Sequence, residues 1–484
     1  MSRNSIHFFM MIGMSVMLAI SGCTDYFTGL LAYESGDYET ALKKFLPLAN
    51  QGHAQAQYNL GVLYDKGHGV AQDYKEAVHW YRQSAEQGVA QAQLSLGVKY
   101  RQGQGVPQDY AKALKWYRLA ADQDHASAQN NLGVMHEHGY GVRKNYARAM
   151  EWYRLAANQN HALAQNNLGV MYQQGYGVRK NYRKAIKWFR LAIDQDHAPG
   201  QNNLGVMYQQ GYGVRQNYGK AIEWFQLAAD QGHAPAQNNL GTMYQQGYRV
   251  QKNYGKAIEW FQLAADQGHA PAQNNLGTMY QQGYRVQKNY GKAIEWFQLA
   301  ADQGHAPAQN NLGTMYQQGH GLPQNYAKAL KWYRLAAKKK HVPAQNNLGV
   351  MYKHGYAIPQ DYQEALKWFR LAAKQGHAPA QYNLGVMYEQ GSGVTQDNAE
   401  AINWFQLAAD QGHPPAQNNL GAKYYQGQGV PKDYTLAYMW ASLAATQGDK
   451  KAAKGLHMIE RKMSSSQITE AQQLIKKWKA ELKK

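Results

Sequence analysis

Apolar positions recur along the chain with the spacing of an amphipathic helix. In one copy of the pattern, Ala128, Leu132, Met135 and His136 fall at i, i+4, i+7 and i+8, which places them on one helical face. Proline in the first turn of several copies suits a helix start, because the first N–H groups of a helix have no internal partner. Gly139 predicts the end of this helix, since glycine adopts the left-handed conformation at little cost.

A second helix follows each first one and opens at an Asp or Asn, both favourable N-caps. In one copy its apolar stripe consists of Tyr110, Ala113, Trp116, Tyr117, Ala120 and Ala121. Alanine occurs at the Ala113 position in every copy, and a small residue facing the bulky tryptophan predicts close approach of two helices. Where glycine is missing after the second helix, Asp or Asn stands in, and these residues tolerate the left-handed region. Two residues beyond the first helix's glycine, Arg249 and Arg285 replace a second glycine, so we expect no positive φ there.

The helix pair repeats every 36 residues, as the tryptophans show. They are Trp80, Trp116, Trp152, Trp188, Trp224, Trp260, Trp296, Trp332, Trp368, Trp404 and Trp440. No single pair can bury its apolar stripe, whereas stacked neighbours form a continuous core. The sequence therefore predicts an all-α, right-handed superhelical solenoid of 36-residue helix-turn-helix repeats, with a concave inner surface.

The repeat also sets the expected domain boundaries. They are a signal peptide at 1–23, an N-terminal capping half-repeat at 24–52, eleven tandem repeats at 53–448, and basic C-terminal capping helices or tail at 449–484.

The first 23 residues have the features of a targeting segment. The apolar run 8–20 is too short for a relaxed membrane span and suits the core of a signal peptide. It ends in Ile-Ser-Gly-Cys at Cys23, which resembles the lipobox of bacterial lipoproteins. That resemblance implies a lipidated Cys23, and Thr24 after it favours the outer membrane, facing the periplasm. The alternative is an ordinary secretory signal with an accidental cysteine. As the only cysteine, Cys23 excludes an intramolecular disulfide framework.

Residues 54–61 (AQAQYNLG) and 73–81 (DYKEAVHWY) resemble the Sel-1-like repeat, a relative of the tetratricopeptide repeat. The resemblance covers roughly residues 30–448. It implies an adaptor or scaffold role, often in the bacterial envelope or in contact between bacterium and host. Some bacterial members carry paired cysteines in each repeat, and this chain has none, which puts in doubt any activity of that subgroup here.

One asparagine recurs in every first helix from the third repeat onward. The candidate ligand-binding residues are Asn131, Asn167, Asn203, Asn239, Asn275, Asn311, Asn347, Asn383 and Asn419. Asparagine is a poor helix former, so its repetition needs a reason. The same slot in tetratricopeptide repeats looks toward the concave surface, which implies binding of a peptide backbone. The alternative is an asparagine that bonds a neighbouring repeat and orders the stack. We expect the adjacent row, Asn130 through Asn418, to be a solvated face.

Histidines mark the turns between repeats and are interpreted as structural. They are His53, His125, His161, His197, His233, His269, His305, His341, His377 and His413. Equivalent residues of successive units should lie about 10 Å apart or more, whereas zinc needs nitrogens about 2 Å from one ion. We therefore expect no metal site and no cofactor. The 12% aromatic content indicates core packing, with stacking on sugars as the alternative.

The chain carries 51 Lys+Arg against 32 Asp+Glu, a formal net charge of +19. Charge of this sign suits nucleic acid in the cytosol, but export argues against that partner. Lipopolysaccharide phosphates, acidic envelope proteins or simple solubility remain as explanations. We find no phosphate-binding loop, zinc-protease or serine-hydrolase motif, so we expect no enzyme activity.

The primary hypothesis is a non-enzymatic scaffold, lipid-anchored in the bacterial cell envelope, that binds protein or peptide partners on the solenoid surface. The alternative is a protein that binds peptidoglycan or regulates cell-wall enzymes. A third reading, a weak hydrolase, has no residue in the sequence to support it.

Overall fold

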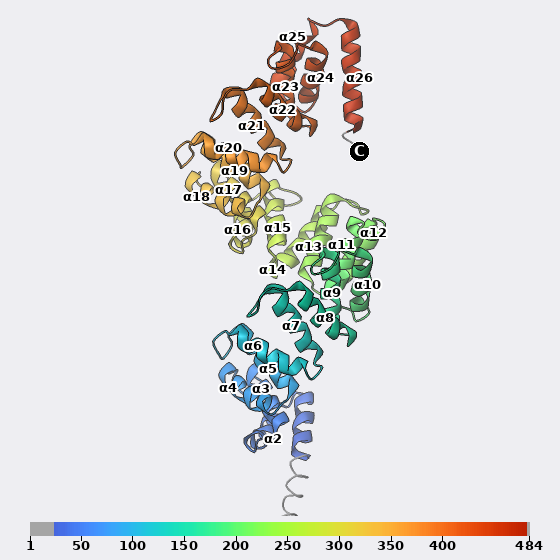
Figure 1. Cartoon of the computed structure of the whole chain (residues 1–484), viewed down its shortest axis with the longest axis vertical. Helices are drawn as coiled ribbons and strands as arrows, with labels where there is room; N and C mark the ends of the chain where they lie inside the picture. The colour runs from blue at the N-terminus through green and yellow to red at the C-terminus, as the bar shows by residue number, and fades with distance from the viewer. Residues whose placement is uncertain (1–23, 482–484) are drawn as a thin grey trace, which may run out of the picture. The chain divides into compact units, whose positions relative to one another are not determined.

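The computed structural model describes residues 24–481, and the regular elements in that range are α-helices. Contacts divide the chain into two compact units, Met1–Ala236 and Gln237–Lys484. The signal segment and Cys23 lie outside the described residues. Within each unit the helices follow one another in chain order (Figure 1), and each packs mainly on the helices before and after it. The predicted all-α solenoid of helix pairs is confirmed.

The first unit contains helical residues 24–35, α2 (Tyr38–Asn50), α3 (Ala54–Lys66), α4 (Tyr74–Glu86), α5 (Ala90–Gln102), α6 (Tyr110–Ala121), α7 (Ala126–His138), α8 (Tyr146–Asn158), α9 (Ala162–Gln174), α10 (Tyr182–Ile193), α11 (Ala198–Gln210) and α12 (Tyr218–Asp230). The unit boundary falls within α13 (Ala234–Gln246).

The second unit contains α14 (Tyr254–Asp266), α15 (Ala270–Gln282), α16 (Tyr290–Asp302), α17 (Ala306–Gln318), α18 (Tyr326–Lys338), α19 (Val342–His354), α20 (Tyr362–Ala373), α21 (Ala378–Gln390), α22 (Asn398–Asp410), α23 (Pro414–Gln426), α24 (Tyr434–Thr446), α25 (Lys450–Glu460) and α26 (Ser465–Glu481). From α3 to α24, the odd-numbered first helices of the repeats are called A helices, and the even-numbered second helices are called B helices.

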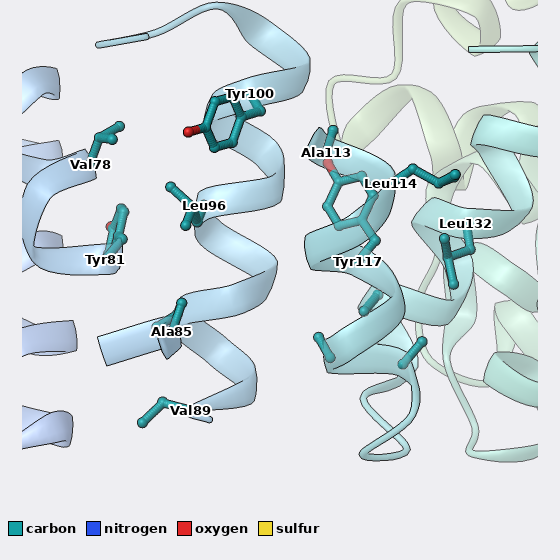
Figure 2. Close-up of a cluster of buried hydrophobic side chains, with 14 of the residues drawn as sticks. Val78, Tyr81, Ala85, Val89, Leu96, Tyr100, Ala113, Leu114, Tyr117 and Leu132 are labelled. Carbon is teal, nitrogen blue, oxygen red and sulfur yellow. The ribbon is translucent and has the colours of Figure 1, made fainter. Parts of the chain in front are cut away.

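Within each unit, clusters of buried apolar side chains span successive helices. In Figure 2, Tyr81 of α4 points toward Leu96 of α5, and beyond α5 lie Tyr117 of α6 and Leu132 of α7. All four side chains are nearly inaccessible to solvent. Since such clusters recur along both units, each repeat is stabilised by apolar contacts with its neighbours.

In most repeats a glycine of the A helix packs against an aromatic ring of the B helix. A Cβ atom placed on Gly97 of α5 would lie 2.7 Å from ring carbons of Tyr117 on α6. Ten repeats, from Gly61 to Gly385, have this pairing with Tyr or Phe. Our expectation that the small residue faces the tryptophan is therefore incomplete. Ala113 is fully buried as expected, but Trp116 is only half-buried.

Helix ends follow the predicted capping chemistry at most positions. Asp109, for example, accepts a hydrogen bond from the backbone N–H of Lys112 at 2.9 Å. After the B helices, Asp124 and Asn160 take φ values of 58° and 61°, as expected for residues that replace glycine. The sequence offered no reason for Lys340, which is also left-handed at 62°.

The expectation for the second glycine position is wrong. Arg249 and Arg285 have φ values of 56° and 57°, and so occupy the same left-handed region as the glycines of other repeats. The loop around Arg285 is closed by the Asn289 N–H donating to the Tyr280 carbonyl at 3.0 Å. The glycine-containing loop of the next repeat has the same bond, from Asn325 to Tyr316, at 2.8 Å. Backbone hydrogen bonds thus impose the conformation, whichever side chain is present.

A glutamine pair links the A helix of a repeat to the turn that follows its B helix. Gln87, after α4, donates to the side-chain oxygen of Gln57 on α3 at 2.7 Å, and Gln57 donates to the Ala49 carbonyl. Ten of the eleven repeats have this pair; the exception has Lys339 where the second glutamine would be. There the side-chain oxygen of Gln309 is buried without a hydrogen-bond partner.

Candidate functional site

The nine candidate asparagines lie on consecutive A helices, and each side chain is half-buried. Within each unit, most of them donate through Nδ2 to the side-chain oxygen of the first asparagine in the preceding repeat. The bonds are Asn167–Asn130 at 3.0 Å, Asn203–Asn166, Asn275–Asn238, Asn311–Asn274 and Asn383–Asn346 at 2.9 Å, and Asn347–Asn310 at 3.0 Å. We call this row the asparagine ladder.

Tyrosine takes the place of the accepting asparagine toward both ends of the ladder. Asn59 donates to the Tyr26 hydroxyl at 3.3 Å, and Asn419 is hydrogen-bonded to Tyr382. At the start of the ladder, the position facing Asn131 is Leu94. The row thus continues past the repeats that carry two adjacent asparagines.

The expectation that the adjacent asparagines form a solvated face is wrong for much of the row. Asn130 is 6% exposed, and Asn310 and Asn346 are 8% exposed. They are buried because each accepts a hydrogen bond from the next repeat, which places the amide between two A helices. The ladder therefore contributes to the order of the stack.

The ladder also retains hydrogen-bonding capacity. A primary amide offers two N–H donors and an oxygen with two lone pairs. The second of the two adjacent asparagines in a repeat, such as Asn311, is called the outer asparagine. It uses one N–H donor to bond the preceding repeat, and its side chain stays half-exposed. The hydrogen bond fixes the orientation of the amide, which lowers the entropy that a ligand would have to remove on binding.

The turn histidines precede the A helices. His53 and His161 accept hydrogen bonds through Nδ1 from the backbone N–H groups of Ala56 and Ala164, at 3.1 and 3.3 Å. Burial lowers the pKa of His161, and the positive charge of His125 in the preceding turn lowers that pKa further. Across the described residues, no group of His, Cys, Asp or Glu side chains is placed to hold a metal ion.

Many tyrosines outside the core stack on one another at the loops, which the sequence reasoning did not find. Tyr146 of α8 stacks on Tyr176 of the next loop, with ring centroids 4.7 Å apart and planes inclined by 8°. The ammonium of Lys144 lies 4.6 Å from the centroid of the Tyr146 ring. Similar stacked pairs recur in both units. Each ring in such a pair has one face against its partner, and the loop tyrosines Tyr176 and Tyr212 remain 38% and 39% exposed.

A comparison with protein families matches eleven consecutive segments, from residues 54–89 to residues 414–449, to the Sel1 repeat. The chain belongs to the Sel1 repeat family. A solved structure described as c5321, a protective antigen of uropathogenic Escherichia coli strains displaying an SLR fold, is 36% identical to this chain. The match covers 90% of this chain and 94% of that one, with a TM-score of 0.63.

A second solved structure, of a Sel1 repeat protein from Oxalobacter formigenes, is 34% identical. That match covers 50% of this chain and 96% of the other, with a TM-score of 0.48. No curated protein matches the chain. Sel1 repeat proteins are generally protein–protein interaction scaffolds and typically non-enzymatic.

The clustered basic residues of this Sel1 repeat protein are exposed to solvent. All six cationic residues of the cluster from Arg179 to Arg190 are exposed, as are Lys338, Lys339 and Lys340.

Among the described residues, an apolar cleft between α23, α24 and α25 is lined by Gly421, Tyr425 and Ile459, with no acid, histidine or lysine in its wall. Within residues 24–481, none of the helices combines the length and apolar character needed to cross a bilayer.

Proposed function

We propose that this Sel1 repeat protein is a scaffold that is lipid-anchored through Cys23 in the bacterial envelope, at the outer membrane and facing the periplasm. The anchor is argued from the apolar run that ends in Ile-Ser-Gly-Cys. The relative from E. coli is described as a protective antigen, which agrees with a location in the envelope. Two or more acyl chains would hold such a protein firmly, whereas one chain binds a membrane only marginally.

The binding role rests on one observation, which is the regular row of half-exposed, pre-oriented amides. An extended peptide presents carbonyl and N–H groups along its backbone, and amides are suited to pair with both. Each repeat contributes a small favourable term, and consecutive repeats reached by one ligand act together. We infer that a protein partner binds along the asparagine ladder through an extended segment.

The anchor is tested in cells that express the full chain. An alkyne-labelled fatty acid should be incorporated into the parent and lost from the Cys23→Ala variant. Parent protein should sediment with outer membranes after fractionation. Unlabelled parent protein in the cytosol would overturn the anchor and leave the binding proposal standing.

The binding role is tested by crosslinked capture from envelope extract, with residues 24–484 as bait. One variant, Asn275→Ala/Asn311→Ala/Asn347→Ala, removes three outer amides together with their bonds. Its matched control, Asn238→Ala/Asn274→Ala/Asn310→Ala, breaks the same bonds but keeps the outer amides. We expect the parent to capture a discrete protein and the first variant to lose it, while the control, whose outer amides remain but are no longer held in place, captures a reduced amount. Equal loss with both variants would assign the ladder to stacking alone.

A further inference from the structure

In eight of the eleven B helices, a leucine is exposed at the same position of the repeat. Its side chain lies three residues after the tryptophan and is between 36% and 49% exposed. These residues are Leu119, Leu155, Leu227, Leu263, Leu299, Leu335, Leu371 and Leu407. Single exposed leucines are ordinary on protein surfaces. A row of them at spacings of 36 residues, or of 72 where Leu191 is only partly exposed, is not scattered, and we call it the leucine row.

The leucine at the same position of the last B helix is covered by the chain itself. Leu443 of α24 is only 1% exposed and shares an apolar cluster with Trp440. Leu474, Ile475 and Trp478 of α26 pack against this cluster. The rings of Trp440 and Trp478 meet edge to face, with centroids 6.2 Å apart. In Figure 1, α26 is the red helix that runs beside α24.

The contact between α26 and α24 therefore shows that an amphipathic helix can pack over a leucine at this position. α26 has 17 residues and is amphipathic: its apolar side chains face α24, and Lys476, Lys477 and Lys479 are exposed. A helix of this length extends about 25 Å, which is long enough to contact more than one B helix. The covered helix α24 contains no charged residue, so apolar contact holds α26 there.

Charge distinguishes the uncovered leucines from one another. On α14, Leu263 lies between exposed Glu259 and Asp266, one turn away on either side. On α16, Leu299 has the same acidic neighbours, Glu295 and Asp302, because residues 241–276 and 277–312 are identical.

On the next two B helices the sign is reversed. Lys331 and Lys338 flank Leu335 on α18. Lys367 of α20 and Lys374, directly after α20, flank Leu371, and Lys367 is ion-paired with Glu364 at 2.9 Å. The second unit thus carries two acidic-rimmed leucines followed by two basic-rimmed ones on an otherwise similar helix face.

We propose that the leucine row over α14 and α16 is a docking surface for a basic amphipathic helix of a partner protein. The partner helix places Leu, Ile or Trp side chains on Leu263 and Leu299, beside the half-buried Trp260 and Trp296. Its lysines lie against Glu259, Asp266, Glu295 and Asp302. The proposal deepens the scaffold role and rests on it, but it uses neither the asparagine ladder nor the lipid anchor. The B helices would therefore bind a folded helix, and the A helices an extended segment.

The probe is a fluorescent synthetic peptide of residues 465–484, which carries five lysines, two glutamates and the apolar residues of α26. Its binding to residues 24–484, in which α26 is present and covers α24, is followed by fluorescence anisotropy. We expect saturable binding that weakens as salt is raised, because the rim contacts are exposed ion pairs. A peptide with Leu474→Ser, Ile475→Ser and Trp478→Ser should bind at least tenfold more weakly.

Matched variants locate the site. Leu263→Ser/Leu299→Ser should weaken binding of the parent peptide at least tenfold, whereas Leu335→Ser/Leu371→Ser should change it less than twofold. Reversing the charges beside the leucines should also distinguish α14 and α16 from α18 and α20. Glu259→Lys/Glu295→Lys weakens binding about tenfold, and Lys331→Glu/Lys367→Glu strengthens it. Circular dichroism melting checks that each variant is folded.

Four results would overturn the proposal. They are no saturable binding by the folded parent, equal losses from both leucine pairs, no effect of charge reversal, and binding that survives every variant through exchange with the resident α26. The three-asparagine variant Asn275→Ala/Asn311→Ala/Asn347→Ala separates this test from that of the proposed function. It should leave peptide affinity unchanged while losing the partner captured along the ladder.

Discussion

The central repeats and the repeats near the two ends fill one pair of positions differently. The positions are 34 residues apart on successive A helices. In the centre, Gln281 of α15 donates to the thioether sulfur of Met315 on α17 at 3.4 Å. Near the ends the same positions hold ion pairs, Asp65 with Lys99 and Glu389 with Lys423. Both lysine side chains are 6% exposed.

The comparison shows that the fold tolerates a buried lysine when its neighbour is an acid. Methionine occupies the second position in eight consecutive repeats, Met135 to Met387, and lysine appears only in the repeats on either side of that run. Taking a lysine out of water costs several kcal/mol unless a partner compensates. Where the acid is replaced by Arg101, opposite Met135, the buried Nε of the arginine has no hydrogen-bond partner. Lysine at the second position thus occurs only opposite an acid, whereas methionine also stands opposite Arg101, Glu137 and Lys353.

The largest effect should come from removing the acid at one end. Asp65→Ala leaves Lys99 buried without its counter-charge and should cost about 3–5 kcal/mol in the free energy of opening α3–α5. The double variant Asp65→Gln/Lys99→Met copies the central pair and should return to within about 1 kcal/mol of the parent. Native-state hydrogen exchange measures this, because repeats open locally.

The control for that experiment is the exposed pair Glu39 and Lys43, whose side chains are 77% and 70% accessible. Glu39→Ala should cost about 0.5 kcal/mol or less. If Asp65→Ala costs no more than Glu39→Ala, the buried pair does not distinguish the end repeats from the central ones.

A second prediction concerns the contact that both regions share. Gly97→Ala near one end and Gly277→Ala in the centre each place a Cβ within 2.8 Å of an aromatic ring. Both should destabilise by similar amounts, about 1–3 kcal/mol, because overpacking forces the ring to move. Chemical denaturation measures the loss. Gly455→Ala is the control: its Cβ meets no atom within 4 Å, so it should stabilise α25. Unequal losses at Gly97 and Gly277 would show that the two regions pack differently.

A third prediction repairs the one central repeat that lacks the glutamine pair. Lys339→Gln should supply the missing donor to the buried oxygen of Gln309 and stabilise α17 and α18 by about 1 kcal/mol. The thermal midpoint and hydrogen exchange in these helices report the change. Lys338→Gln removes the same charge one residue earlier, away from the pair, and should leave stability nearly unchanged. A similar gain from both variants would attribute the effect to charge alone.

The smallest effect concerns the strained arginine of the loop after α15. Arg285→Gly should raise stability by about 0.5–1 kcal/mol, because the left-handed conformation costs an ordinary residue about 1–2 kcal/mol and glycine less. Arg215→Gly, at a loop position without a positive φ, is the matched control and should give no gain. Equal shifts in the unfolding midpoint would contradict the strain assigned to Arg285.

Sequence reasoning gave the helices, their caps and the repeat because these depend on local residue types. The apolar stripe of Ala128, Leu132, Met135 and His136 is buried as predicted. The glutamine pair of Gln87 and Gln57 was not predicted, because both residues are polar and they lie 30 positions apart. The periodicity of apolar residues within one helix does not relate such positions. A glutamine recurring at both positions in repeat after repeat was the available signal.

The candidate site could be predicted only in part, for a similar reason. The sequence placed the nine asparagines on A helices, and the structure adds their bonds to the preceding repeat, which join residues 37 positions apart. Whether the ladder binds a ligand stays a prediction. The leucine row was not predicted, because the pattern of apolar residues along a helix does not distinguish an exposed leucine from a buried one. Only burial separates Leu263 from Leu443.

The central claim is that the repeats act together as a binding scaffold, and crosslinking mass spectrometry of the captured complex tests it most directly. Residues 24–484 carry lysines in nearly every repeat, so the crosslinks report which repeats touch the partner. The account predicts one partner crosslinked to lysines of several consecutive repeats, including Lys256 and Lys292 in the second unit. Crosslinks confined to a single repeat or to the C-terminal tail, or no discrete partner at all, would contradict it.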